Sequence, residues 1–385
     1  MSIANFVKNN RWIYKIYYYG MSLVLKLIRV FVRTDDKLIL FVSYGGRHFN
    51  DSPKCIYEAM RLDPRYENFK LVWAFINPNE HSQDTPKIRI DSFKYYLTAL
   101  KARCWVTNVV IERGLNFKGK NTFYLHTTHT TLPKLMGYDD VSDSFTLPCG
   151  FKYDCSCAQS ETEKKMQESM FRIDSQKIIV SGYPKNDILC NYSRFKRDEI
   201  RNKLGFDNKR KLILYAPTYR DISFGAMRCP VDFKKWEQVL GKEYAVLFRA
   251  HPVVANETKI DSSTGFVFDV SHYPDNMELM IASDMLISDY SGIFFEYGVQ
   301  DKPMFCFAYD YDQYINVRGL YFDIRELIPG GNMNEDSLLS LIKSSTYDTV
   351  KEQITRFRKM YVSEYGHATE ICLNTIYNNI FNENK

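Results

Sequence analysis

The chain has 385 residues, of which 45% are hydrophobic and 25% charged, and its formal net charge is +5. This length and apolar content exclude a disordered protein and predict about two domains, at roughly one domain per 150 residues. The small positive charge does not call for nucleic acid as a partner and agrees better with an anionic substrate or an anionic membrane surface.

The first predicted element is an amphipathic helix over residues 11–33, a stretch that is apolar and aromatic with basic residues spaced through it. Lys26 and Arg29 interrupt the apolar run of about 20 residues that a membrane-spanning helix needs, and no signal-peptide cleavage site follows. We expect this helix to lie on a bilayer, with its basic side chains toward anionic headgroups. The side chains expected to enter the bilayer are Trp12, Leu23, Leu27 and Ile28. A helix packed on the protein's own core is the alternative.

From Leu38 onward, short apolar runs alternate with helical segments, which predicts mostly parallel sheets with helices on both faces. The first set of predicted strands is 38–43, 71–76, 104–108, 122–127 and 177–182, and the second set is 212–217, 244–252, 265–270, 284–289 and 303–308. We therefore predict an α/β fold of two Rossmann-like domains that face each other across a central cleft.

The expected division of the chain follows from these two sets of strands. It is a membrane-associating segment at 1–35, a first domain at 36–190, and a second domain at 205–385 that includes the C-terminal helices. A charged helical connector near 186–205 joins the two domains.

Candidate site residues follow the strands, because ligands of open α/β sheets bind beyond the carboxyl ends of the strands. The segments at these positions are 43–46, 126–129, 182–187, 216–221, 249–252 and 288–292. They include His129 and His251, and histidine is the usual general base near neutral pH because its unperturbed pKa is about 6.5. Thr130 and Thr131 supply hydroxyls that fix the tautomer of His129 or contact a phosphate.

An anion site is predicted where the strand ending near Ile287 gives way to a helix. Ser291 can cap this helix, and Gly292 lets a ligand approach the backbone. The free N–H groups and the helix dipole favour a phosphate there. Glu296, near the helix start, either complements the helix dipole or accepts a hydrogen bond from a ribose hydroxyl.

Further cations and hydroxyls follow the other strands of the second set. Arg249 and His251 are two residues apart, so an extended segment points both to the same side and pairs a phosphate-binding cation with an acid–base group. Pro217, Thr218 and Arg220 also follow a strand, and a guanidinium suits bidentate contacts to phosphate.

Several common catalytic motifs are missing from the sequence. There is no GxSxG, P-loop, HExxH or glycine-rich dinucleotide motif, which removes most support for hydrolase triads, ATPases and nicotinamide dehydrogenases. The nine cysteines include no CxxC pair, so we expect reduced thiols and no metal site.

Seven motifs carry a resemblance that covers residues 38–325. In order they are FVSYGGRHFNDSPKCIYE (41–58), GYPKND (182–187), LYAPTYRD (214–221), RAHP (249–252), YPD (273–275), ISDYSGIFFE (287–296) and RGLYFD (318–323). This set, in this order, resembles the CDP-glycerol glycerophosphotransferases of teichoic acid synthesis. The resemblance implies a GT-B-like fold and a peripheral enzyme on the cytoplasmic face of the membrane.

The resemblance also implies a reaction and roles for particular residues. A polyol phosphate would pass from CDP-glycerol or CDP-ribitol to a hydroxyl of a lipid-linked acceptor, with release of CMP and without a cofactor. The first domain would hold the acceptor and the second the CDP donor. By the same resemblance, His129 and His251 are the catalytic pair, and Glu296 binds the cytidine ribose. The groups expected to hold the pyrophosphate are Lys185, Thr218, Arg249, Ser291 and the backbone of Gly292.

The chain departs from the family pattern at two places. Where the family usually has His-Gly-Thr-Pro-Leu-Lys-Lys-Leu-Gly, residues 129–137 read His-Thr-Thr-Leu-Pro-Lys-Leu-Met-Gly, so Thr130 replaces a glycine. The second serine after the family's Asp-Tyr is Gly292 in this chain. Two alternatives stay open: a GT-B nucleotide-sugar glycosyltransferase or epimerase, which would release UDP, and a membrane-bound scaffold with a decayed site, which would bind lipid and release no nucleotide.

Overall fold

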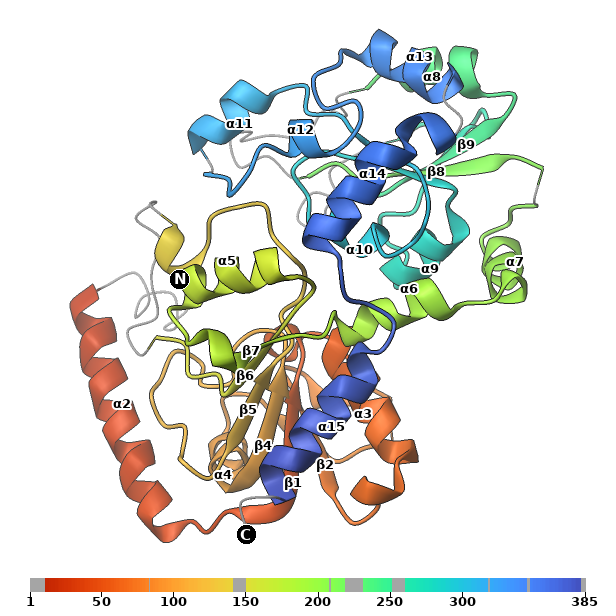
Figure 1. Cartoon of the computed structure of the whole chain (residues 1–385). Coiled ribbons are helices and arrows are strands. Elements are labelled where there is room, and N and C mark those ends of the chain that lie inside the picture. Colours follow the sequence, from red (N-terminus) through yellow and green to blue (C-terminus); the bar gives the residue numbers. More distant parts are fainter. Residues whose placement is uncertain are drawn as a thin grey trace.

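A computed structural model describes residues 11–82, 84–140, 150–207, 209–218, 231–250, 260–317, 319–344 and 347–381. Figure 1 shows two α/β domains, one stacked on the other, with α2 along the outside of the first. Two of the predicted site residues, Arg220 and His251, lie outside the described residues.

The first domain is built on a parallel sheet of seven strands in the order β3-β2-β1-β4-β5-β6-β7. The strands are β1 (Asp35–Val42), β2 (Lys70–Phe75), β3 (Lys87–Arg89), β4 (Ala102–Thr107), β5 (Phe123–His126), β6 (Cys155–Ala158) and β7 (Ile178–Val180). Leu40 of β1 is level with Val72 on one side and Trp105 on the other. The continuous apolar run of β1 is explained by this central place, since both of its faces are covered.

Two hydrophobic cores lie against the first sheet, one containing Leu40 and Trp105 and the other containing Phe41 and Trp73. Neighbouring residues of a strand point to opposite faces, so alternate side chains enter different cores. The helices of this domain are α2 (Arg11–Phe31), α3 (Asp51–Leu62), α4 (Phe93–Lys101) and α5 (Glu161–Phe171). The connector then forms α6 (Asp187–Asn191) and α7 (Arg194–Lys203).

The second domain has a parallel sheet of five strands in the order β10-β9-β8-β11-β12. The strands are β8 (Lys211–Tyr215), β9 (Tyr244–Phe248), β10 (Val267–Asp269), β11 (Met285–Ser288) and β12 (Met304–Cys306). The helices are α8 (Phe233–Leu240), α9 (Asn276–Ala282), α10 (Ile293–Tyr297), α11 (Tyr311–Val317), α12 (Ile324–Leu327), α13 (Glu335–Ser344) and α14 (Tyr347–Tyr361). The predicted α/β fold with two parallel sheets is confirmed.

The last described helix, α15 (Ala368–Phe381), belongs to the first domain, which corrects the prediction that 205–385 forms one unit. Its apolar residues Cys372 and Ile376 lie in the same core as Phe41. Both carboxylate oxygens of Asp187 accept backbone N–H groups at the start of α15, from residues 368 and 369, at 3.0 and 2.8 Å. The chain therefore crosses between the domains a second time, after α14.

Helix α2 presents two different faces. The buried side chains of Tyr14, Tyr18 and Leu25 lie on the face toward the first domain. The opposite face carries an exposed apolar stripe made of Trp12, Ile16, Tyr19, Leu23, Leu27 and Val30, each at least 56% exposed. Their spacing of three or four residues places them in one row.

One predicted member of this stripe, Ile28, is half-buried and packs on the first core, so its assignment to a membrane-entering face is wrong. The helical period explains the error, because residue 28 falls on the same side as Leu25 and Met21. Within the described part of the chain, none of the helices combines the length and apolar character needed to cross a bilayer.

Candidate active site between the domains

The carboxyl ends of the two sheets meet through the loops that follow their strands. After β5, Thr130 Oγ1 donates a hydrogen bond of 3.2 Å to the carbonyl of Gly292, which follows β11 in the other domain. Further along the same loop, the backbone at 133–135 pairs with 319–321 by bonds of 2.8 and 2.9 Å. The strand ends predicted to share one cleft are thus brought together in space.

Lys185 is the centre of a buried charge cluster at this junction. Its Nζ lies 2.8 Å from a carboxylate oxygen of Glu296 on α10 and 3.3 Å from one of Asp51 at the start of α3. It also donates to the carbonyl of His129. Burial alone would lower the pKa of Lys185, but Asp51 and Glu296 raise it above its ordinary value. The ammonium therefore stays charged and ties the two domains together.

This arrangement shows where two predicted ligand-binding residues lie. Lys185 and Glu296, expected at the pyrophosphate and at the ribose, form an ion pair with each other, and their side chains are 6% and 8% exposed. A pair so buried is strongly favoured to remain intact, because removing one partner leaves the other as an uncompensated charge. Glu296 is therefore held in place by Lys185.

His129 lies beside this cluster. Its ring is half-buried, with its centre 6.0 Å from that of Tyr44. Burial, and after it the charge of Lys185, lower the pKa of His129, while Asp51 and Glu296 act in the opposite direction. The lowered pKa favours the neutral imidazole, which is the state that a general base requires.

The backbone around His129 is strained at three positions. Tyr44, Asp51 and Thr128 have φ values of 45°, 64° and 51°, a left-handed conformation that is unusual for residues other than glycine. Such strain costs about 1–3 kcal/mol per residue and concentrates at functional sites. The Tyr44 hydroxyl donates to Asp51 at 2.9 Å, and the Tyr44 N–H donates to Asn108 at 2.9 Å.

Asp51 and Asn108 are site residues that the sequence reasoning missed. Asp51 starts a helix, and carboxylates are so common there that the position gives no functional signal. It does lie in the 41–58 motif, which was the available hint. Asn108 follows β4, but the predicted strand 104–108 included it, and no segment after that strand was considered as part of the site.

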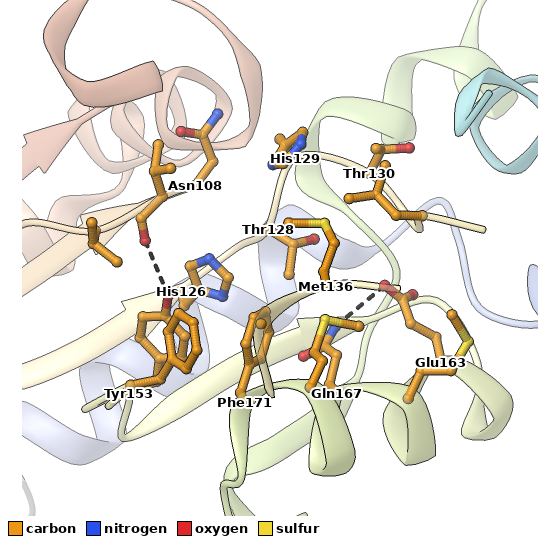
Figure 2. Close-up of a pocket in the computed structure, with 17 residues that line it drawn as sticks. Asn108, His126, Thr128, His129, Thr130, Met136, Tyr153, Glu163, Gln167 and Phe171 are labelled. Carbon is orange, nitrogen blue, oxygen red and sulfur yellow. Dashed lines mark hydrogen bonds between the residues drawn. The ribbon is translucent and has the colours of Figure 1, made fainter. Parts of the chain in front are cut away.

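A cavity of about 120 Å³ opens beneath the His129 loop (Figure 2). His129 and Thr130 lie at one end, and His126, Tyr153 and Phe171 lie at the other. Most of its wall is apolar, from residues that include Met136, Phe151, Met166, Met170 and Phe171. This lining suits an uncharged part of a substrate better than a phosphate.

His126, although close to His129 along the chain, has a structural role. Its ring stacks on that of Tyr153 with centres 3.9 Å apart, and its Nδ1 lies 3.2 Å from the hydroxyl of Ser156. Burial lowers the pKa of His126 to about 3. The imidazole therefore stays neutral at any ordinary pH.

The predicted donor-binding residues share one edge of the second sheet. Pro217 and Thr218 follow β8, Arg249 follows β9, and Ser291 follows β11, and these three strands are neighbours. The Ser291 hydroxyl accepts the N–H of Ile293, the first residue of α10, at 3.2 Å, although the N-cap position itself is Gly292.

Two residues of the predicted set make contacts within the protein. One terminal nitrogen of Arg249 donates to the carbonyls of Val270 and Tyr273 at 3.0 and 2.9 Å, which fixes the guanidinium next to the sheet edge. Thr131 is 1% exposed and accepts a hydrogen bond of 3.0 Å from Gln159, so it supports the loop from behind.

The two departures from the family pattern, Thr130 and Gly292, touch each other. A Cβ atom added at Gly292 would lie 2.4 Å from Oγ1 and 2.7 Å from Cγ2 of Thr130, and 2.8 Å from the backbone oxygen of Thr131. The threonine therefore occupies the space that a side chain at position 292 would need.

Comparison with known proteins gives consistent matches. The family model described as CDP-Glycerol:Poly(glycerophosphate) glycerophosphotransferase matches residues 24–380. A teichoic acid poly(glycerol phosphate) polymerase of Staphylococcus epidermidis is 34% identical over 76% of this chain, which spans 43% of that protein. A teichoic acid glycerol-phosphate transferase of Staphylococcus aureus is 30% identical over 89% of this chain and 93% of its own length. The solved structure of the wall teichoic acid polymerase TagF superposes with a TM-score of 0.82 at 30% identity, over 100% of both chains.

Proposed function

Because the chain belongs to the CDP-glycerol:poly(glycerophosphate) glycerophosphotransferase family, we propose that it transfers glycerol phosphate from CDP-glycerol to a hydroxyl of a lipid-linked acceptor in teichoic acid synthesis. The two curated relatives named above are both glycerol phosphate enzymes, which favours glycerol over ribitol in the donor. The observation that carries the proposal is the place of His129 beside the buried cation Lys185, where the loops that follow the two sheets meet.

In the proposed reaction, the acceptor hydroxyl gives its proton to a histidine and its oxygen attacks the β-phosphorus of the donor. A new P–O bond forms to the acceptor, the P–O bond to the α-phosphate breaks, and CMP leaves with the electron pair. Of the two candidate histidines, His129 is among the described residues and His251 lies outside them. The backbone at Gly292, the Ser291 hydroxyl and Arg249 would bind the charge that grows on the departing phosphate.

The proposal also gives each domain a substrate. The sheet edge with Thr218, Arg249 and Ser291 would bind the CDP donor, while the apolar cavity beneath His129 would take an uncharged part of the acceptor. The transfer needs the two substrates and no cofactor. We expect CMP release to continue at the same rate in EDTA, and a loss of activity that added Mg²⁺ restores would contradict this.

We further propose that the enzyme is a peripheral protein of the cytoplasmic membrane face, attached through the exposed stripe of α2. Trp12, Leu23 and Leu27 are 77%, 58% and 56% exposed and lie in one row. Lys15 and Lys26 are also exposed on this helix and would meet anionic headgroups. An apolar row of this kind on a helix already packed on its own domain supports contact with lipid.

The deciding experiment measures CMP release by the purified protein with CDP-glycerol, CDP-ribitol and a UDP-sugar as separate donors, each with a membrane-lipid acceptor extract. We expect CMP from CDP-glycerol. CMP from CDP-ribitol alone would change the donor and keep the reaction. UDP release would favour a glycosyltransferase. No release of nucleotide from any of the three donors would favour a scaffold.

A further inference from the structure

A second pocket, of about 440 Å³, lies in the first domain and shares the lining residue Phe151 with the cavity beneath the His129 loop. Its lining residues fall in three segments, 116–120, 151–154 and 172–177, which precede β5, β6 and β7. Because these strands are parallel, all three segments lie at the amino ends of the strands. His129 follows the carboxyl end of β5, so His129 itself lies at the other end of this strand from the 116–120 segment.

The second pocket carries an excess of positive charge. Its cationic residues are Lys118, Lys120, Lys152, Arg172 and Lys177, and its carboxylates are Asp154 and Asp174. Asp154 is already engaged, since one of its oxygens lies 2.7 Å from Lys118 Nζ and accepts the N–H of Tyr124 at 2.9 Å. A cluster of this sign attracts an anion.

A further positive charge lies next to the pocket. The guanidinium of Arg29, from α2, lies against Gly119, so that a Cβ atom there would be 1.4 Å from its central carbon. Its Nη1 is buried and, among the described residues, has no hydrogen-bond partner. Because Nη1 is enclosed and Arg29 does not line the pocket, Arg29 contributes positive charge beside the pocket and no direct contact through this atom.

The pocket adjoins the helix that carries the exposed apolar stripe. Asn116, one of the lining residues, donates its backbone N–H to the hydroxyl of Ser22 on α2 at 2.9 Å. The inner side of α2 therefore borders the cationic pocket while its outer side presents Leu23 and Leu27. The cationic pocket would suit the charged headgroup of an anionic lipid, and the neighbouring apolar row would suit its acyl chains.

We propose that this pocket binds the phosphodiester headgroup of an anionic membrane lipid, with Lys152 and Lys177 as the groups that contact the phosphate and Arg29 as a further positive charge beside them. Guanidinium and ammonium groups form charge-assisted hydrogen bonds to phosphate oxygens. Each basic residue near an anionic bilayer contributes about 1 kcal/mol. The site would hold the first domain on charged lipid independently of the donor, so its test needs no CDP-polyol and does not depend on transfer activity.

The test measures binding of the full chain to vesicles of phosphatidylcholine with and without 30% phosphatidylglycerol. For Lys152→Gln/Lys177→Gln we expect binding to the anionic vesicles to weaken about tenfold or more, with binding to neutral vesicles unchanged. Lys234→Gln/Lys242→Gln is the matched control, since it removes the same charge from exposed positions of the second domain. Equal losses in both double variants would reduce the effect to net charge and overturn the proposal.

A second variant separates lipid binding from stability. Arg29→Met removes the positive charge and keeps an apolar stem, so we expect an unchanged or higher Tm in lipid-free buffer together with weaker binding to anionic vesicles. A clear drop in Tm with vesicle binding intact would show a structural arginine. Free glycerol 3-phosphate could instead raise the Tm of the wild type but not of Arg29→Met, while none of the three substitutions changes binding to vesicles. In that case the ligand is a soluble phosphate and the lipid assignment fails.

Discussion

At the scale of single residues, His129 lies among groups with opposing effects on its proton. Lys185 and burial favour the neutral ring, whereas Asp51 and Glu296 favour the charged one. If His129 is the base, His129→Ala should lower kcat at least ~100-fold with a small change in KM for the donor. The measurement is CMP release against donor concentration, with the exposed His272→Ala as control. A rate within threefold of wild type would contradict the assignment.

The charge cluster also predicts a pH dependence. Removing the ammonium in Lys185→Met leaves Asp51 and Glu296 opposed by burial alone, so the pKa of His129 should rise. A base is inactive when protonated, and the acidic limb of the kcat/KM profile should therefore move to higher pH. The limb is measured on the residual activity of the variant. A limb that stays in place or moves to lower pH would show that His129 is not the titrating group.

The contact between Thr130 and Gly292 is open to a double-mutant cycle. Gly292→Ser places a side chain against Thr130, so we expect a loss of at least tenfold in kcat/KM as the two domains are pushed apart. Adding Thr130→Gly frees that space and lets the loop move, and it should restore most of the activity. Gly20→Ser, at a position with open surroundings, is the control. Additive losses in the double variant would mean that the pair is not coupled.

At the scale of elements, α2 joins a core-facing side to an exposed one, and this limits how its membrane role can be tested. Deleting residues 1–33 would also remove Tyr14 and Leu25 from the first domain. Leu23→Glu/Leu27→Glu changes only the exposed row and should move the protein from the membrane to the supernatant fraction. Phe195→Glu, on the exposed side of α7, is the control. An unchanged distribution of the double variant would refute attachment through this row.

The strands show how much of the fold the sequence could predict. All ten predicted strands exist, because each has a run of apolar residues that is buried in a parallel sheet. Two strands were missed, β3 and β6. Strand β3 contains only one apolar side chain, Ile88, and β6 reads Cys-Ser-Cys-Ala, whose small side chains carry little hydrophobic signal.

The candidate site was predictable only in part, because the sequence locates strand ends but not the way the sheets face each other. The strand ends placed His129, Lys185 and Gly292 among the predicted site residues. The pairing of Lys185 with Glu296 depends on how the two sheets face each other, and sequence periodicity carries no information on that. The placement of α15 was missed because an apolar helix face does not specify which core covers it.

At the scale of the whole molecule, the two domains are held together by the Lys185 cluster, by the contact of the 129–135 loop with 292 and 319–321, and by two crossings of the chain. The buried ion pair is the element most sensitive to change. Glu296→Gln should therefore lower Tm more than loss of the exposed pair in Glu352→Gln, because it leaves Lys185 with one carboxylate instead of two. Thermal unfolding followed by circular dichroism measures both, and equal Tm values would contradict this role.

The position of α15 has a consequence for how the protein is made on the ribosome. When residue 190 has been synthesised, every strand of the first sheet exists, but the helix that covers part of one face is still missing. The whole second domain is translated before residues 368–381 appear. Phe41, Tyr66 and Leu125 belong to the core that α15 completes, so the nascent first domain displays an unfinished apolar surface throughout this interval. The first domain is therefore the first whose strands are synthesised and the last whose core is complete.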